Sequence, residues 1–244
     1  SSKYALNNGV LQIERSAFTN VMDDKVLDNE HDIVILCENE QEKFEISQEI
    51  TLVDYKIGTA DELDQFRAEV LCVSAGATYA LLTANIDASD IAWAIKNCPF
   101  TGVFDGQGYT ISGINITTTG IFRGFKNGTL KNVAFVNIVN NKNASETSLL
   151  TWDGNDSSGV IENVYMQGSF VGAGKNLAGI AWGLAGMTIK NVIIDVEFAN
   201  GDDAAHYAIS GQTSSSNKFN SNSNSISHHA FISVIFTFVS PEHQ

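Results

Sequence analysis

Short runs of alternating apolar and polar residues fill much of the second half of the chain, which is the pattern of half-buried β-strands. Residues 192–198 form the clearest run, with Asp195 and Glu197 on its polar side. Residues 164–170 repeat the alternation, and Gly168 takes one of the apolar places. The pattern predicts strands that bury one face in a core and expose the other to water.

Four five-residue segments align without gaps, at residues 110–114, 129–133, 160–164 and 188–192. Their fourth positions hold the residue types that adopt the left-handed backbone conformation most readily, namely Gly113, Asn132, Asn163 and Asn191. We therefore expect the same sharp bend in four successive coils of a solenoid. The uneven spacing of the bends fits coils whose connecting loops accept insertions.

An amphipathic helix is predicted after Thr59, because Thr59 and Glu62 form a capping box ahead of an apolar stripe at Leu63, Phe66 and Val70. An isolated helix that leads into β-structure is typical of a lid over one end of a core. Before it, three short β-rich runs are separated by acidic turns, at residues 9–13, 32–36 and 43–47. These runs predict a small N-terminal β region.

Aromatic residues recur shortly before the bends, at Phe122, Trp152 and Trp182. Because the series begins with a phenylalanine, we expect a column of stacked aromatic residues inside the core. The alternative is a surface on which a sugar ring stacks against the tryptophans.

The order of these features resembles a known family. The resemblance lies in residues 57–63, 79–87, 100–114 and 120–122 together with Trp93, and includes the Phe-Asp-Gly-x-Gly-Tyr-Thr-Ile turn that starts at Phe104. These segments resemble right-handed parallel β-helix (pectin-lyase-like) proteins with GLUG-type repeats, which occur in bacterial surface and secreted proteins. Similar solenoids occur in phage tail and fibre proteins. The resemblance covers about residues 57–198 and brings no fixed catalytic motif.

The resemblance implies an all-β fold, a right-handed parallel β-helix with an N-terminal capping helix and a small N-terminal β region. The expected segments are the acidic β region at residues 1–56, the capping helix and first strands at 57–98, the coils at 99–198, and a polar loop with a terminal strand at 199–244. In the last segment, residues 211–224 are rich in Ser and Asn and predict a loop, and residues 230–239 are an apolar strand that must pair. That strand is either the last coil or a strand lent to a neighbouring chain.

Charge and cysteine content exclude several classes of protein. The chain has 28 acidic and 14 basic residues and a net charge of −14, so nucleic acid is not expected as a partner. Its apolar runs are too short to insert into a membrane as a helix. Cys37, Cys72 and Cys98 lack the spacing of a zinc site. No metal and no cofactor are expected.

Two motifs resemble known sites but fail in detail. Residues 104–108 are glycine-rich like a phosphate loop, but a strand follows them, which favours a tight turn. Asp153, Asn155 and Ser157 begin like a calcium loop, yet Gly159 comes one place late and Val164 stands where a bidentate carboxylate belongs. A third group, Asp202, Asp203 and His206, has the composition of a solvated turn.

Asp195 and Glu197 could act as an acid and a base on the outer face of a coil. The neighbouring coils are expected to place Val136 and Ile138, then Gln167 and Ser169, at the same stations, so no column of carboxylates forms. Ala134, Val136 and Ile138 are instead expected to form an apolar outer face that a loop or another subunit covers.

We therefore expect a non-catalytic structural or adhesion module, extracellular, at the cell surface or in a virion, that binds a glycan or a surface protein. Homo-oligomers or larger assemblies are expected partners as well. The candidate ligand-binding residues are Trp152, Asp153, Asp195 and Glu197, with no catalytic residue assigned. A basic patch of Arg123, Lys126 and Lys131 is a further candidate for an acidic sugar. The alternative is a carbohydrate-active enzyme, a polysaccharide lyase or glycoside hydrolase, on the same scaffold.

Overall fold

The chain forms two units, residues 1–51 and residues 52–244. The computed structural model describes residues 4–7, 10–13, 30–38, 43–51, 53–71, 78–96, 98–143, 146–172, 176–184, 186–198, 205–207, 209–213 and 229–234. The first unit contains two antiparallel hairpins. One joins β1 (Tyr4–Asn7) to β2 (Val10–Ile13), and the other joins β3 (Glu30–Glu38) to β4 (Lys43–Thr51). The predicted N-terminal β region is confirmed.

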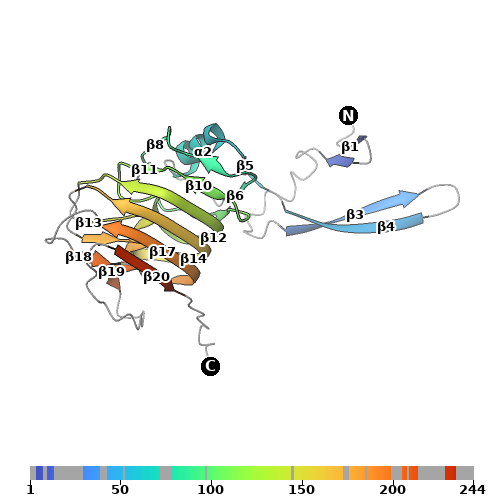
Figure 1. Cartoon of the computed structure of the whole chain (residues 1–244). Coiled ribbons are helices and arrows are strands. Elements are labelled where there is room, and N and C mark those ends of the chain that lie inside the picture. The colour runs from blue at the N-terminus through green and yellow to red at the C-terminus, as the bar shows by residue number, and fades with distance from the viewer. Residues whose placement is uncertain are drawn as a thin grey trace, which may run out of the picture. The chain divides into compact units, whose positions relative to one another are not determined.

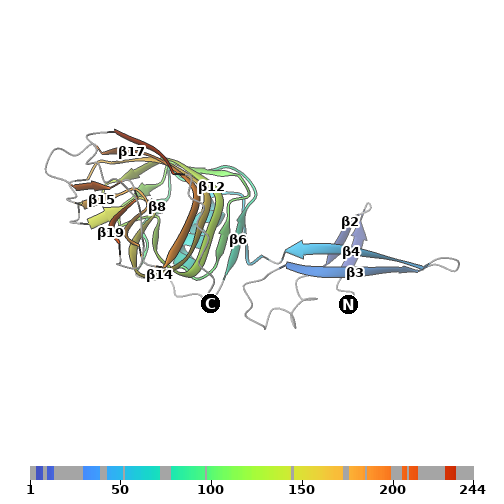
Figure 2. The same ribbon diagram turned by 90° about the horizontal axis from the view of Figure 1, so that it is seen from below.

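The second unit is a parallel β-solenoid of about four turns, which confirms the predicted fold class. Its first wall stacks in the order β5 (Tyr55–Ile57), β6 (Tyr79–Leu82), β9 (Val103–Asp105), β12 (Phe122–Asn140), β14 (Thr151–Phe170), β16 (Ala181–Leu184) and β19 (Ser210–Thr213). Strands β12 and β14 continue round the bend into the second wall, beside β7 (Ile86–Asp87), β8 (Ala92–Trp93), β10 (Thr110–Ser112), β11 (Asn115–Ile116) and β17 (Met187–Phe198). A third sheet holds β13 (Glu146–Ser148), β15 (Asn176–Ala178) and β18 (Ala205–Tyr207). Figure 1 shows the long strands side by side, and Figure 2 shows how they wrap around the core.

Three of the predicted bends form one column. Asn132, Asn163 and Asn191 have φ angles of 55°, 54° and 50°, in the left-handed region. Their side chains form a ladder in which Asn191 Nδ2 donates to Asn163 Oδ1 (3.0 Å) and Asn163 Nδ2 donates to Asn132 Oδ1 (2.9 Å). The ladder ends on a carboxylate, because Asn132 Nδ2 donates to Asp105 Oδ1 at 3.1 Å. Asparagine therefore both permits the bend and links successive coils.

Gly113 does not belong to this column, which corrects the predicted alignment. Its φ is 76°, but Thr110 pairs with Ala134, so Gly113 is in register with Asn137. The coil before Asn132 is instead aligned through Phe104, which pairs with Leu130. The solenoid thus has a second bend, at Gly113 and Asn137, and the sequence alignment grouped Gly113 with residues of the first bend.

Asn137 also corrects the expected apolar outer face at one of its three positions, Ile138. Its φ of 54° marks a left-handed residue, and the register between β12 and β14 shifts between Phe135 and Ile138. The shift moves the alternation of faces by one residue, so Ile138 is fully buried rather than outward. Val136 and Ala134 are only half-buried at the surface.

Helix α2 (Ala60–Phe66), continued by a π-helical turn to Leu71, covers the N-terminal end of the core. Its capping box is present: Thr59 Oγ1 accepts from the Glu62 N–H (3.2 Å) and Glu62 Oε2 accepts from the Thr59 N–H (3.1 Å). Phe66 is buried, and its ring centroid lies 5.4 Å from that of Phe104. The predicted capping helix is confirmed.

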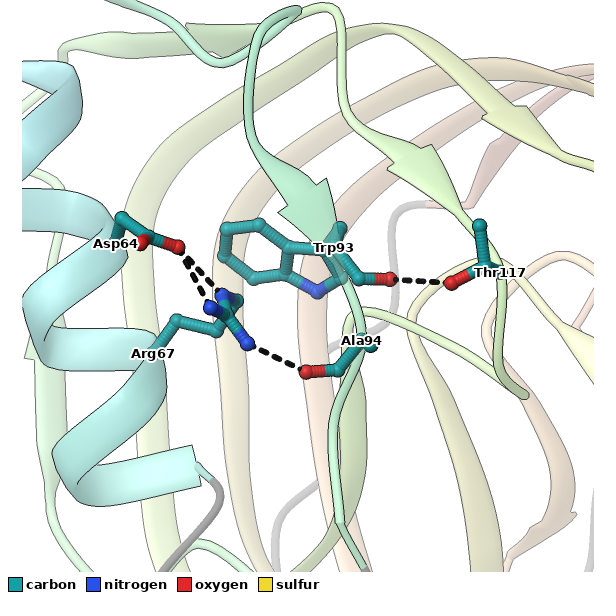
Figure 3. A network of polar contacts seen from close by, with 5 residues as sticks. All are labelled: Asp64, Arg67, Trp93, Ala94 and Thr117. Atoms are coloured by element: carbon teal, nitrogen blue, oxygen red, sulfur yellow. Dashed lines mark hydrogen bonds and ion pairs between the residues drawn. The ribbon is translucent and has the colours of Figure 1, made fainter.

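A polar contact ties this helix to the second wall (Figure 3). Arg67 is held by Asp64, with Arg67 Nε donating to Asp64 Oδ1 at 2.8 Å, and its Nη1 donates to the carbonyl of Ala94 at 2.7 Å. In the same wall, Thr117 Oγ1 donates to the Trp93 carbonyl at 3.2 Å. The helix end is therefore fixed to the coil by a charge-assisted hydrogen bond.

Strand β20 (His229–Val234) lies at the other end. It pairs antiparallel with β17, from Val192 opposite Val234 to Glu197 opposite His229. The described part of the terminal apolar segment thus pairs within the chain, and it is not a further parallel coil. None of the described helices is long and apolar enough to span a membrane.

Candidate functional site

Two neighbouring residue columns run along β12, β14 and β16, and they differ by one position. Phe122 pairs with Thr151, and Thr151 pairs with Ala181. All three are buried, so this is the inner column. Trp152 and Trp182 follow Thr151 and Ala181, and both are only partly buried. The predicted core column of Phe122, Trp152 and Trp182 is therefore wrong, because strand alternation places the tryptophans on the outer side.

The outer column consists of Arg123, Trp152 and Trp182. The Arg123 guanidinium carbon lies 3.8 Å from the centroid of the Trp152 ring, which is a cation–π contact. The ring of Trp182 meets that of Tyr207 edge-on, with 6.0 Å between the centroids. The tryptophans are thus held by neighbours from adjacent coils rather than by the core.

The indole nitrogen of Trp152 lacks the hydrogen bond that a buried indole normally makes. Trp152 Nε1 is shielded from solvent and has no hydrogen-bond partner among the described residues. The indole of Trp93, inside the solenoid, does make this hydrogen bond, since its Nε1 donates to the Ile121 carbonyl at 3.1 Å. A buried donor without an acceptor costs about 1–3 kcal/mol of folding free energy, so an acceptor that reached the Trp152 N–H would gain a hydrogen bond that the chain itself does not supply among the described residues.

A backbone bulge follows Trp152 directly. Asp153 pairs with Gly124 and Ser158 pairs with Lys126, so residues 154–157 stand opposite Phe125 alone. The side chains of Asp153, and of Asn155 and Ser157 in the failed calcium motif, lie outside the described residues. Within the described part of the chain, no three metal-ligating side chains come together.

Asp195 and Glu197 lie elsewhere. Both are on β17, beyond the bend at Asn191, where Asp195 pairs with Gln167 and Glu197 with Ser169. Asp195 is partly buried and Glu197 is exposed. The structure therefore places the four candidate ligand-binding residues at two separate stations, Trp152 and Asp153 before a bend and the two carboxylates after it.

The glycine-rich segment and the group of Asp202, Asp203 and His206 add no residue to the outer column. Residues 104–108 form the expected tight turn, in which the Gln107 N–H donates to Asp105 Oδ1 (2.9 Å) and the Tyr109 N–H donates to the Gly106 carbonyl (2.7 Å). Asp202 and Asp203 lie outside the described residues, as does the side chain of His206. These positions contribute nothing to the described site.

A column of alternating charge, which the sequence analysis missed, runs beside the asparagine ladder. Its members are in register on successive coils: Asp105, Lys131, Glu162 and Lys190. Lys131 Nζ lies 3.4 Å from Asp105 Oδ2, and the Asp105 side chain is buried. Lys131 is thereby engaged by Asp105, as Arg123 of the same expected patch is engaged by the Trp152 ring. The column could have been found by aligning residues on the bends.

Comparisons with known proteins give little beyond this. No family model matches the chain, and no curated protein matches it. One solved structure, a Bacteroides ovatus protein described as a "putative immunoglobulin A1 protease", is similar at 21% identity with a TM-score of 0.47. The similarity covers 66% of this chain, and the chain spans 62% of the length of that structure.

Proposed function

We propose that the solenoid is a non-catalytic binding module, extracellular or in a virion, that recognises a glycan at the outer column of Arg123, Trp152 and Trp182. The observation that carries the proposal is the Trp152 indole N–H, shielded and without an acceptor among the described residues. Sugar hydroxyl and carboxylate oxygens supply acceptors of this kind. Aromatic rings beside hydrogen-bond donors suit a ligand that is apolar on its C–H faces and polar at its rim.

The cation–π contact decides how a sugar would be held. Arg123 covers one face of the Trp152 ring, so a sugar cannot stack on that face. The edge of the ring, with its N–H, is then the part that meets the ligand, and the groups that shield Nε1 from solvent must move aside when the ligand binds. Recognition therefore depends on a hydrogen bond from Trp152 Nε1, assisted by the neighbouring guanidinium.

The scaffold supports this role because it keeps the column in one geometry. Arg123 and Trp152 project from strands that pair in parallel from Phe122 opposite Thr151 to Asn140 opposite Phe170, and this pairing resumes beyond the bulge that follows Trp152. Sites on paired strands are held more precisely than sites on loops. Little conformational entropy is lost when such a site binds.

The test is a glycan array read with the wild-type chain and with Trp152→Phe, which keeps an aromatic ring and removes the N–H. The matched control is Tyr165→Phe, which removes one hydroxyl from another outer station of the same strand. We expect the wild type and the control to bind the same glycan class and Trp152→Phe to lose about tenfold in affinity, the loss of one hydrogen bond. Equal binding by Trp152→Phe, or no glycan bound by the wild type, would overturn the proposal.

Incubation of the bound glycan with the protein tests the non-catalytic half of the proposal. We expect the glycan to keep its length. Cleavage that disappears in Asp195→Asn would assign the chain to the carbohydrate-active enzymes instead.

A further inference from the structure

The outer column of the first wall continues for one more coil. Strand β19 lies next to β16 in the sheet, and the two strands pair in parallel from Ala181 opposite Ser210 onward. Trp182 therefore stands opposite Gly211. Because glycine has no side chain, the column ends in a station at Gly211 that β19 itself leaves without one. We call this position the fourth station.

The start of the column shows how its neighbouring members lie on one another. Arg123 comes from the coil before Trp152, and its guanidinium carbon lies 3.8 Å from the centroid of the Trp152 ring, over one face of that ring. Outer residues one coil apart thus lie face to face. By the same geometry, a group at the fourth station would lie over the ring of Trp182.

A second aromatic ring stands beside Trp182. Tyr207, on β18 of the third sheet, lies with its ring centroid 6.0 Å from that of Trp182, at an angle of 67° between the ring planes. At that angle Tyr207 does not lie flat over the indole as a parallel ring would. Both side chains are only partly buried. The last coil therefore presents two steeply inclined aromatic rings next to a glycine.

We propose that one sugar ring of the bound glycan occupies the fourth station, with its C–H face stacked on the indole of Trp182. The inference rests on the proposed function, because it gives the same glycan a second contact beyond the Trp152 N–H. The spacing suits a ring, since neighbouring strands lie about 4.8 Å apart and stacked rings have centroids about 4.5–7 Å apart. The sugar then continues the column in place of a side chain.

The two contacts determine which glycans make both. Trp152 lies on β14, and Gly211 lies two coils further on, on β19. Two strand spacings are about 10 Å, which is longer than one sugar ring. The ligand class is therefore an oligosaccharide or polysaccharide that runs along the solenoid axis, and a monosaccharide makes only one of the two contacts.

The experiment is calorimetric titration of the full chain with the mono-, di- and tetrasaccharide of the glycan class that the array selects. Trp182→Leu removes the stacking surface, and Gly211→Leu puts a side chain into the fourth station. The matched control is Ala134→Leu, which adds similar bulk at a half-buried outer position of the second wall. We expect the wild type and the control to bind the tetrasaccharide about tenfold more tightly than the monosaccharide, and the other two variants to lose this difference.

The outcomes separate this inference from the function on which it rests. If Trp152→Phe weakens binding but Trp182→Leu binds the tetrasaccharide as the wild type does, the fourth station is wrong and the site at Trp152 stands. Equal wild-type affinity for the monosaccharide and the tetrasaccharide has the same meaning. A wild type that binds no glycan overturns both proposals. If Gly211→Leu fails to fold, the length series and Trp182→Leu still decide.

Discussion

Two columns of residues follow the same strands one residue apart, yet they differ in burial and in chemistry. The inner column is Phe122, Thr151 and Ala181, and the outer column is Arg123, Trp152 and Trp182. The inner column is buried and changes size from coil to coil while remaining free of charge. The outer column carries a guanidinium and two indoles, with one indole donor left unpaired among the described residues. Each column thus holds one buried polar atom without a hydrogen-bond partner among the described residues, the Thr151 hydroxyl in the inner column and the Trp152 indole N–H in the outer one, and the columns differ in that only the outer one carries a charge and indole rings.

The difference teaches that a single step in register decides what an aromatic residue in a solenoid does. Phe122 packs against other rings, with centroid distances of 5.0 Å to Phe125 and 5.6 Å to Phe100. Trp152 meets a cation instead. Substitutions that separate packing from hydrogen bonding can break or sharpen this comparison.

The largest effect is expected from Phe122→Ala. Removal of a fully buried ring costs about 3–5 kcal/mol of unfolding free energy, because a cavity replaces its contacts. Arg123→Ala, the next residue on the outer column, should cost about 1 kcal/mol, mainly the cation–π contact. Urea unfolding followed by circular dichroism measures both values. Equal losses would show that the two columns are not inner and outer.

Asn163→Ala should have the next largest effect. Alanine in the left-handed conformation costs about 1–2 kcal/mol, and the two ladder hydrogen bonds of Asn163 are lost as well, so we expect about 2–3 kcal/mol. Asn163→Gly keeps the bend and loses the ladder, and should cost about 1 kcal/mol. A glycine variant less stable than the alanine variant would contradict the role of the φ angle at this bend.

The same positions show how far the sequence predicts the structure. The helix cap and the bends at Asn132, Asn163 and Asn191 are local, because Thr59, Glu62 and the asparagines act through their own backbone preferences, and these were predicted. Gly113 was misplaced because a glycine and an asparagine are equivalent in backbone preference but not in coil register. Register is set by pairing with distant strands, such as Thr110 with Ala134, which a local pattern does not contain.

The candidate site was predicted less well for the same reason. Trp152 was recognised as a candidate, but its inner or outer position depends on whether it or Thr151 pairs with Phe122. The contact with Arg123 follows only from that register. The left-handed conformation of Asn137, which leads to the burial of Ile138, was likewise not predicted, because no repeated segment distinguishes Asn137 from the other asparagines of the chain.

A smaller, pH-dependent effect is expected at Tyr55, whose ring belongs to the core and whose hydroxyl lies outside it. The ring packs edge-on against Phe66 (5.4 Å), and the hydroxyl donates to Glu69 Oε2 at 2.7 Å. This hydrogen bond, with burial, raises the pKa of Tyr55 from 10.0 to about 12. The neutral phenol is the form that the fold favours, so its contribution to stability is complete below pH 10 and is lost as the pH rises through 12.

The same bond lowers the pKa of Glu69, together with a hydrogen bond from Gln65. That contribution is present at neutral pH and is lost as the pH falls through the lowered pKa. Thermal melting of the wild type and Tyr55→Phe measures both limits. We expect the difference in melting temperature to be largest near neutral pH and to shrink above pH 10 and in acid. A difference independent of pH would mean that only the ring matters.

The most direct test of the central claim, that the outer column binds a glycan through the Trp152 indole, is nuclear magnetic resonance of the indole N–H groups. The chain has three tryptophans, and therefore three such signals to assign. On titration with the glycan selected by the array, we predict a large shift of the Trp152 signal and none of the Trp93 signal, since Trp93 already donates to Ile121. A Trp152 signal unchanged at saturating glycan, or equal shifts of Trp152 and Trp93, would contradict the account.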